Sequence, residues 1–181
     1  MIETERLIIR LADVGEVPEI VRYYRDNHDH LQPFSPRFGA EQLDEAMWRE
    51  QVIERQLEFT RHESFRAFIF QRDAPLRIAG NVNLTQVVRG AFQSCVLGYN
   101  LEEGVQGRGY MTEAVKATVT FAFKQWKLHR IAANYMPRNT RSAAVLERCG
   151  FQIEGRAPAY LLIDGRWEDH VLTAVINPDW R

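Results

Sequence analysis

Apolar and polar residues alternate along the chain with two different periods. Some segments are short and rich in apolar and β-branched residues, which predicts strands, and others place apolar residues three or four positions apart, which predicts amphipathic helices. The expected strands cover residues 6–11, 65–70, 78–88, 95–101, 129–135, 153–163 and 167–176, and the expected helices cover about 13–27, 41–61, 112–126 and 139–149. The predicted fold class is therefore α/β (α+β), with a mixed central sheet of about seven strands and about four helices.

Length and composition restrict the chain to one domain. It has 181 residues, of which 45% are hydrophobic and 26% charged, and a domain of this size buries about 70% of its unfolded surface. Neither a repeat nor a low-complexity linker divides the sequence, so we expect a single domain over 1–181. The two cysteines, Cys95 and Cys149, are too few for a disulfide framework or a four-thiolate zinc site, and neither is expected to act as a nucleophile.

The sequence carries no signal for export or for a membrane. Its first residues include acidic side chains where a secretory signal would have a basic segment followed by an apolar one. Nowhere do about eighteen apolar residues follow one another, which is the length that spans a bilayer. We therefore expect a soluble, cytoplasmic protein with no membrane partner.

The formal net charge of −1 hides an uneven distribution of charged residues. Residues 41–63 hold seven acidic side chains against three arginines, a net charge of −4, whereas residues 106–148 hold eight basic side chains against two acidic ones, a net charge of +6. The basic region favours an anionic ligand and the acidic one a basic acceptor, although both also fit solvated helix faces. There is no dense stripe of basic and aromatic residues, so direct binding of nucleic acid is not expected.

A glycine-rich loop, Glu102–Gly109, lies between a predicted strand and a predicted helix. Backbone N–H groups at a helix start lack partners, and neighbouring glycines let an anion approach them. The loop departs from the P-loop because Tyr110 stands where a lysine is required. It departs from the dinucleotide-binding pattern because Thr112 stands where the third glycine is required. The loop is therefore a candidate phosphate cradle, and ATP and NAD are disfavoured.

Two motifs make the sequence similar to a known family. The run Gln106-Gly107-Arg108-Gly109-Tyr110-Met111 resembles the coenzyme A loop of the GCN5-related N-acetyltransferases (GNAT), although Met111 replaces the last glycine or alanine. Further along, Asn139-Thr140-Arg141-Ser142 and a helical run closed by Gly150-Phe151 resemble the second motif of that family. The resemblance implies the GNAT fold, in which the sheet is splayed between its fourth and fifth strands.

Segments from about residue 80 to the end also resemble the RimJ type of ribosomal-protein alanine N-acetyltransferases. They include Leu97-Gly98-Tyr99, Asn134-Tyr135-Met136-Pro137 and Asp169-His170-Val171. This resemblance implies direct transfer of an acetyl group from acetyl-CoA, within a ternary complex, to the N-terminal alanine of a small-subunit ribosomal protein. The alternatives are a small-molecule amine as acceptor (a polyamine, an amino acid or an antibiotic), or a non-catalytic ribosome-binding module.

The resemblance also implies which residues bind the coenzyme. The pantetheine arm would pair with the backbone of the strand that ends at Leu101, and the loop amides would hold the pyrophosphate. Asn139 would bond to the pantetheine, with arginines near the phosphates. The implied residues are Tyr99, Asn100, Leu101, Gln106, Gly107, Arg108, Gly109, Tyr110, Met111, Asn139, Ser142 and Arg148.

An α-amine acceptor makes modest demands on a catalytic base. Its pKa lies near 7.7–8.0, against about 10.4 for a lysine side chain, so a useful fraction is already free base at neutral pH. A carboxylate acting through a water molecule would suffice. The candidates are Glu102, Glu103 and Asp169.

The departing thiolate gains from a proton donor, because a thiol has a pKa near 8.5. Ser142 matches the second motif, whereas Leu146 stands where some relatives have a tyrosine. Tyr135 and Tyr160 are alternative donors. The catalytic residues we predict are Ser142, Glu103 and Tyr135.

A pair of histidines, His28 and His30, could suggest a metal site. Two histidines without a third ligand are more typical of a loop, so no metal is predicted.

Overall fold

The computed structural model, which describes residues 1–180, contains one mixed sheet of eight strands in the order β1-β2-β3-β4-β5-β6-β8-β7. The strands are β1 (Ile2–Glu3), β2 (Leu7–Arg10), β3 (Phe65–Gln71), β4 (Ala74–Val88), β5 (Ser94–Leu101), β6 (Arg130–Tyr135), β7 (Gln152–Ile163) and β8 (Arg166–Ile176). The α-helices are α1 (Val17–Asp26), α2 (His28–Leu31), α3 (Glu45–Thr60), α4 (Tyr110–Gln125) and α5 (Thr140–Arg148). Short 3-10 helices are η1 (Val14–Glu16), η2 (Gln32–Phe34), η3 (Ala40–Leu43) and η4 (Glu103–Val105).

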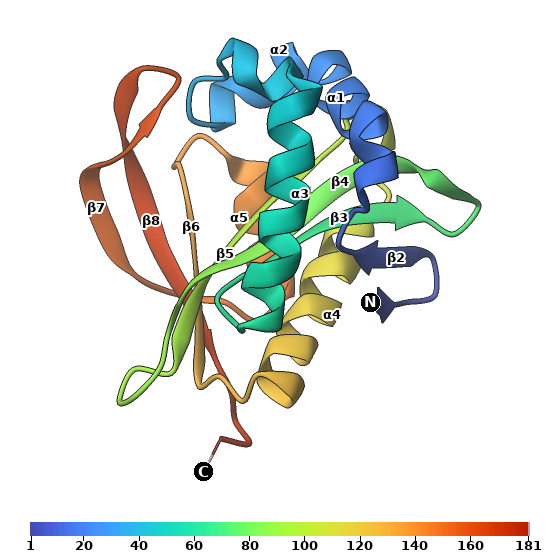
Figure 1. Ribbon diagram of the computed structural model, residues 1–181. Coiled ribbons are helices and arrows are strands. Elements are labelled where there is room, and N and C mark those ends of the chain that lie inside the picture. Colours follow the sequence, from blue (N-terminus) through green and yellow to red (C-terminus); the bar gives the residue numbers. More distant parts are fainter. Residues whose placement is uncertain (181) are drawn as a thin grey trace.

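The sheet opens between β5 and β6, the parallel pair in a sheet whose other described pairs are antiparallel. Pairing stops at Val96 and Ala132, although β5 continues to Leu101 and β6 to Tyr135. The two strands diverge beyond that point (Figure 1). These are the fourth and fifth strands expected from the sequence, so the predicted splay is confirmed.

Helices cover both faces of the sheet (Figure 1). On one face, Val115 of α4 and Leu146 of α5 belong to the larger cluster of buried apolar residues. On the other face, Ile20 of α1 and Trp48 of α3 belong to a second cluster. The strands serve both clusters because successive side chains of a strand point to opposite faces.

All seven predicted strands and four predicted helices are present, and besides the 3-10 helices the structure adds one short strand and one short α-helix. β1, which pairs with β2, has only two residues and is too short to show a periodic pattern in the sequence. α2 is a single turn that begins directly after Asn27, where the first predicted helix ends. β4 begins at Ala74 rather than at residue 78, because its pairing with β3 continues to the turn.

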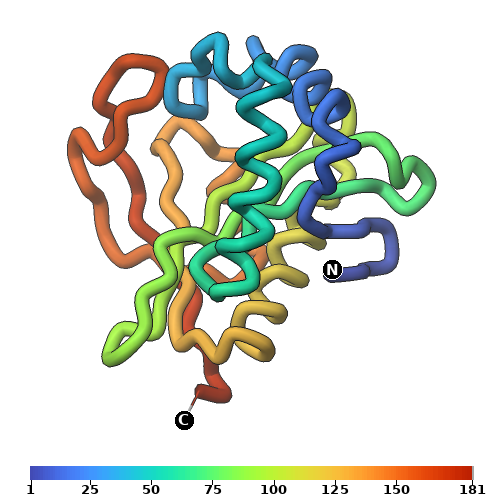
Figure 2. Tube along the Cα trace, in the orientation of Figure 1, coloured from blue at the N-terminus to red at the C-terminus, as the bar shows by residue number. Residues whose placement is uncertain are grey.

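The segment after α2 is tied to the tip of the β7–β8 hairpin. The Asp164 backbone N–H donates to the Ser35 carbonyl at 3.0 Å. The guanidinium of Arg138 donates to the Pro33 carbonyl at 2.9 Å and to Glu168 at 3.1 Å. Figure 2 shows these two parts of the trace side by side at one end of the molecule. The contacts join the N-terminal third of the chain to its C-terminal hairpin across the splayed end of the sheet.

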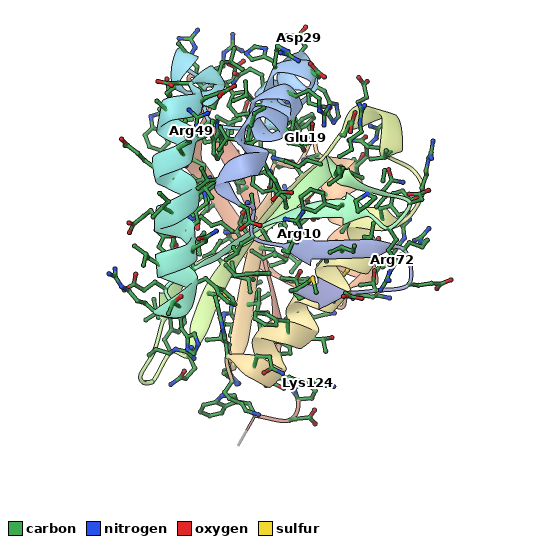
Figure 3. All side chains as sticks on the ribbon, turned by 45° about the vertical axis from the view of Figure 1, so that its right-hand side comes forward. Arg10, Glu19, Asp29, Arg49, Arg72 and Lys124 are labelled. Atoms are coloured by element: carbon green, nitrogen blue, oxygen red, sulfur yellow. The ribbon has the colours of Figure 1, made fainter. Side chains whose placement is uncertain are left out.

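At the opposite end of the molecule, a hollow of about 900 Å³ lies beside the end of α4 and the last described residues. Lys124 marks this end in Figure 3, and Asp29 of α2 lies at the other. Among residues 1–180, no helix is both long and apolar enough to cross a membrane.

Candidate active site

A cleft of about 910 Å³ occupies the splay between β5 and β6. Four parts of the chain line it: α2 with η2, the end of β5, the loop that leads into α4 with the first turn of that helix, and one side of α5 with the residues just before it. Every residue expected to bind the coenzyme lies along this cleft except Arg108, whose carbonyl instead accepts a hydrogen bond from Arg6 at 2.9 Å. Segments far apart in the sequence therefore meet at one site.

The free edge of β5 presents unpaired backbone groups to the cleft. The Glu102 N–H donates to the Ala79 carbonyl at 2.8 Å, which sets the alternation of hydrogen bonds between β4 and β5. Residues one apart in an antiparallel strand direct their backbone groups to opposite sides, so those of Tyr99 and Leu101 point away from β4. Beyond Val96 no strand pairs with β5 on that side. The Leu101 carbonyl lies 3.4 Å from the side-chain nitrogen of Gln106. The other outward groups of Tyr99 and Leu101 have no partner among residues 1–180 and are free to pair with an extended ligand.

The glycine loop ends at the start of α4, and two positive backbone angles form its turn. Gly107 has φ of +76° and Gly109, the N-cap, has φ of +79°, a region that glycine occupies without a steric penalty. In the described chain the backbone N–H groups from Gly107 to Thr112 donate to no protein acceptor. A helix start with free amides attracts anions. The geometry therefore matches the predicted phosphate cradle.

Met111, which departs from the family pattern, does not crowd this turn. Its side chain is 7% exposed and packs in the larger core cluster with Ala114 and Val115. The Tyr110 ring lies 4.6 Å from the guanidinium carbon of Arg6, and its hydroxyl accepts from Gln71 at 3.1 Å. The first turn of α4 is thus held by the core on one side and, on the other, by Arg6 just before β2 and by Gln71 of β3.

One side of α5 forms the opposite wall. The Asn139 side chain accepts from the Ser142 backbone N–H at 3.1 Å and caps the helix. Gly150, with φ of +84°, ends the helix, and the Phe151 N–H returns to the Leu146 carbonyl at 3.0 Å. Asn139 and Gly150 thus fix the length of α5. The cap also fixes how Ser142 faces the cleft.

Ser142 and Tyr99 form a pair of hydroxyl groups across the cleft. Their oxygens lie 2.8 Å apart, and the Tyr99 hydroxyl is also 3.2 Å from the Ser142 carbonyl. Burial raises the pKa of Tyr99 far above its ordinary value, against a smaller lowering by the hydrogen bond to Ser142. Tyr99 therefore remains protonated at neutral pH and can donate to the serine oxygen.

Gln106 connects the loop to both walls of the cleft. Its side-chain oxygen accepts from Arg141 at 2.5 Å, and its nitrogen is 2.7 Å from the ring nitrogen of His30. The same nitrogen lies 3.4 Å from the Leu101 carbonyl. In this structure Gln106 satisfies one of the free backbone groups of the β5 edge.

The three candidate bases differ in what already holds them. Glu102 accepts from Arg77 at 2.8 Å, and the Asp169 carboxylate accepts from the Ala159 N–H at 2.8 Å. The Glu103 side chain lines the cleft, is exposed, and has no protein partner among residues 1–180. Of the three, Glu103 is therefore the carboxylate available to a ligand.

The alternative proton donors do not line the cleft. Tyr135 is half-buried and packs against the larger core cluster. Tyr160 accepts from the Asn134 side chain at 3.2 Å, and its ring lies 5.5 Å from that of His170. The structure thus brings Ser142 and Glu103 to the cleft but not Tyr135.

Sequence reasoning missed the wall formed by α2 and η2. His30, Leu31 and Phe34 line the cleft, and the guanidinium of Arg138 lies 5.3 Å over the Phe34 ring. The signal in the sequence is the stretch Gln32–Gly39, in which two prolines and a glycine indicate turns around Phe34, but this stretch matches no motif. Within residues 1–180 no group of three His, Cys, Asp or Glu side chains is arranged to hold a metal ion.

The cleft offers groups that could hold the acetyl-pantetheine arm and the pyrophosphate of acetyl-CoA. A pantetheine arm carries two amides, which match the free groups of Tyr99 and Leu101. A Cβ added at Gly107 would meet no atom within 4 Å, so the loop is open on the side of the cradle. Arg141 and Arg148, near the two ends of α5, also line the cleft and would supply positive charge for phosphates.

The fold, the splayed edge and the amide cradle are those of an acyltransferase that uses an acyl-coenzyme A as donor. The chain belongs to the acetyltransferase (GNAT) domain family, which matches residues 6–152. It is 40% identical over 179 residues to the [ribosomal protein uS5]-alanine N-acetyltransferase of Escherichia coli, covering 98% of this chain and 91% of that protein.

Two solved structures agree with this assignment. The crystal structure of ribosomal-protein-S5-alanine acetyltransferase from Vibrio fischeri has a TM-score of 0.94 and 35% identity, and the match covers 99% of this chain and 97% of that one. Mycobacterium smegmatis RimJ in complex with CoA-disulfide has a TM-score of 0.86 and 28% identity, covering 94% and 81%. The predicted family and fold are confirmed.

Proposed function

We propose that this protein is an acetyl-CoA-dependent N-α-acetyltransferase that acetylates the N-terminal alanine of a small-subunit ribosomal protein. The observation that carries the proposal is the unpaired edge of β5 running into the free amides before α4. The relatives named above as uS5- and S5-alanine acetyltransferases support uS5 as the acceptor.

The coenzyme is proposed to lie with its pantetheine along Tyr99 and Leu101 and its pyrophosphate on the amides from Gly107 to Met111. M. smegmatis RimJ, a relative solved with a CoA-disulfide, supports this choice. The carbonyl of the thioester then lies beside backbone donors of β5, which can stabilise the oxyanion that develops during attack.

The reaction is proposed to be a direct transfer. The nitrogen of the free α-amine bonds to the thioester carbon, the carbon–sulfur bond breaks, and the sulfur takes a proton from Ser142. The Tyr99 hydroxyl, 2.8 Å from the Ser142 oxygen, then gives its proton to that oxygen. Tyr99 takes up a new proton from solvent. The amine gives up its proton to Glu103 through a water molecule.

The acidic segment 41–63 is poorly placed to bind the N-terminus of the acceptor. It forms η3 and α3, and none of its residues lines the cleft. Two of its acidic groups are held within the protein, since Glu45 pairs with Arg49 at 2.9 Å and Glu58 with Arg66 at 3.2 Å. A contact with a basic acceptor would therefore involve residues of the acceptor beyond its first few.

Acetyl transfer to three acceptor classes tests the proposal. A peptide with the N-terminal sequence of uS5, a peptide whose only free amine is a lysine side chain, and a polyamine are each incubated with acetyl-CoA and the protein. We expect transfer to the alanine peptide at the highest kcat/KM. Transfer to the polyamine alone would identify a small-molecule enzyme, and absence of transfer to all three would support a binding role without catalysis.

A further inference from the structure

Asn100 stands apart from its neighbours on β5. Tyr99 and Leu101 face α4 and α5 with the larger core cluster, and both have backbone groups directed to the coenzyme side. The Asn100 side chain points to the other face, towards α1, and also lines the cleft. It is therefore in reach of a molecule that enters along α2 and η2.

The orientation of the Asn100 carboxamide is set by two donors. The Tyr23 hydroxyl donates to Asn100 Oδ1 at 2.6 Å, and Asn81 Nδ2 donates to the same oxygen at 2.8 Å. Asn83 Nδ2 donates in turn to Asn81 Oδ1 at 3.0 Å, so Asn81 also has a defined orientation. Tyr23 is completely buried, and burial raises the pKa of its hydroxyl well above the ordinary value, so it remains a donor.

These contacts leave one group of Asn100 unused. Its Nδ2 makes no hydrogen bond to any of residues 1–180, and this atom is accessible to solvent. Because Oδ1 is held against α1 and β4, the two N–H donors of Nδ2 open into the cleft. A rigid donor next to the β5 edge is suited to a specific acceptor oxygen.

We propose that Asn100 is a specificity-determining residue whose Nδ2 donates a hydrogen bond to the carbonyl oxygen of the acceptor's first residue. This inference rests on the proposed function. In an N-terminal residue the reacting amine and the carbonyl are separated by a single carbon atom, whereas a lysine side chain or a polyamine has no carbonyl there. A donor at this position therefore selects α-amines of peptides over other primary amines. Tyr23 and Asn81 act as positioning residues.

The test compares an alanine peptide with sec-butylamine, which keeps the methyl-bearing carbon next to the amine but lacks the carbonyl. The measured quantity is the ratio of kcat/KM for the peptide to that for the amine. We expect Asn100→Ala to lower this ratio about 10-fold, as the loss of one hydrogen bond predicts. Asn100→Asp keeps the shape and both accepted bonds but replaces the donor with an oxygen, so we expect at least the same fall.

Two further variants separate recognition from structure. Tyr23→Phe removes one bond that holds the carboxamide, and we expect a smaller fall in the ratio, of about 3-fold. Asn83→Ala removes a carboxamide of the same network that does not line the cleft, and we expect a ratio within about 2-fold of the wild-type value. Should Asn100→Ala fail to fold, Asn100→Asp answers the question, because it keeps the partners of Tyr23 and Asn81.

An unchanged ratio in folded Asn100→Ala or Asn100→Asp would overturn the inference while leaving the proposed function intact. A wild-type protein that acetylates the amine but not the peptide would overturn the proposed function itself, and the inference with it. The two failures are therefore distinguishable in one set of assays.

Discussion

Replacing Ser142 with alanine tests the assignment of the proton donor. The substitution removes the hydroxyl that lies 2.8 Å from the Tyr99 hydroxyl and leaves the cap by Asn139, which uses the Ser142 backbone N–H. A positioned general acid contributes about 10²- to 10⁴-fold. We therefore expect kcat to fall by at least about 100-fold, with little change in the KM for acetyl-CoA.

The partner of the serine hydroxyl should have a smaller effect. Tyr99→Phe removes one half-buried hydrogen bond, which is worth about 0.5–1.5 kcal/mol and corresponds to about 2- to 13-fold in rate. Since Tyr99 acts only through Ser142, the double variant should be no slower than Ser142→Ala alone.

The assay follows release of the coenzyme thiol with the alanine peptide as acceptor, and calorimetry gives the affinity for acetyl-CoA. Thermal denaturation checks that Ser142→Ala loses no more than about 1.5 kcal/mol of stability, the value of one hydrogen bond. Wild-type turnover in Ser142→Ala would refute its role as the acid. Multiplicative effects in the double variant would refute the coupling to Tyr99.

Three further predictions concern the loop, one ion pair and the cysteines. Gly109→Ala must hold alanine at φ of +79°, so we expect a loss of about 1–2 kcal/mol in thermal denaturation and weaker acetyl-CoA binding by calorimetry, whereas Gly104→Ala, without a positive φ, should change neither. Burial opposes ionisation of Glu113, but its hydrogen bonds to the N-terminal segment outweigh this and lower its pKa. Glu113→Gln should therefore destabilise the protein at pH 7, and the difference in the free energy of unfolding should shrink as the pH falls below the ordinary glutamate pKa and vanish below the lowered pKa of Glu113. Burial raises the pKa of Cys95 to about 12, and partial burial also raises the pKa of Cys149, so both should react slowly with an aromatic disulfide reagent at pH 8. Rapid modification of two thiols in the native protein would contradict this prediction.

The local patterns of the sequence were sufficient for most elements and for the coenzyme side of the cleft. Gly107, Gly109 and Asn139 determine their own neighbourhoods, because a positive φ angle and a helix cap depend on residues only a few positions away. The spacing of apolar residues in α4 is likewise local, because the helix needs only a sheet to pack against and not a particular order of strands. Motifs that depend on such local geometry can be predicted from the sequence alone.

Residues whose role depends on partners far away in the chain could not be predicted in this way. Asn100 was expected only to lend its backbone to the coenzyme, and its side chain acquires a direction from Tyr23, 77 positions earlier in the chain. Tyr135 was a reasonable proton donor by residue type, yet the register of β6 turns it into the core cluster and away from the cleft lining.

By itself, the sequence determined the class of fold, the glycine turn before α4 and the cap of α5, since each depends on short-range geometry. Only the tertiary structure decided which carboxylate stays unpaired and which residues form the second wall. Glu102 and Glu103 are adjacent in the sequence, but Arg77 of β4 holds the first and leaves the second in the cleft. The wall of α2 and η2 exists because Arg138 and Asp164 tie that segment to the C-terminal hairpin, a long-range contact that leaves no periodic trace in the chain.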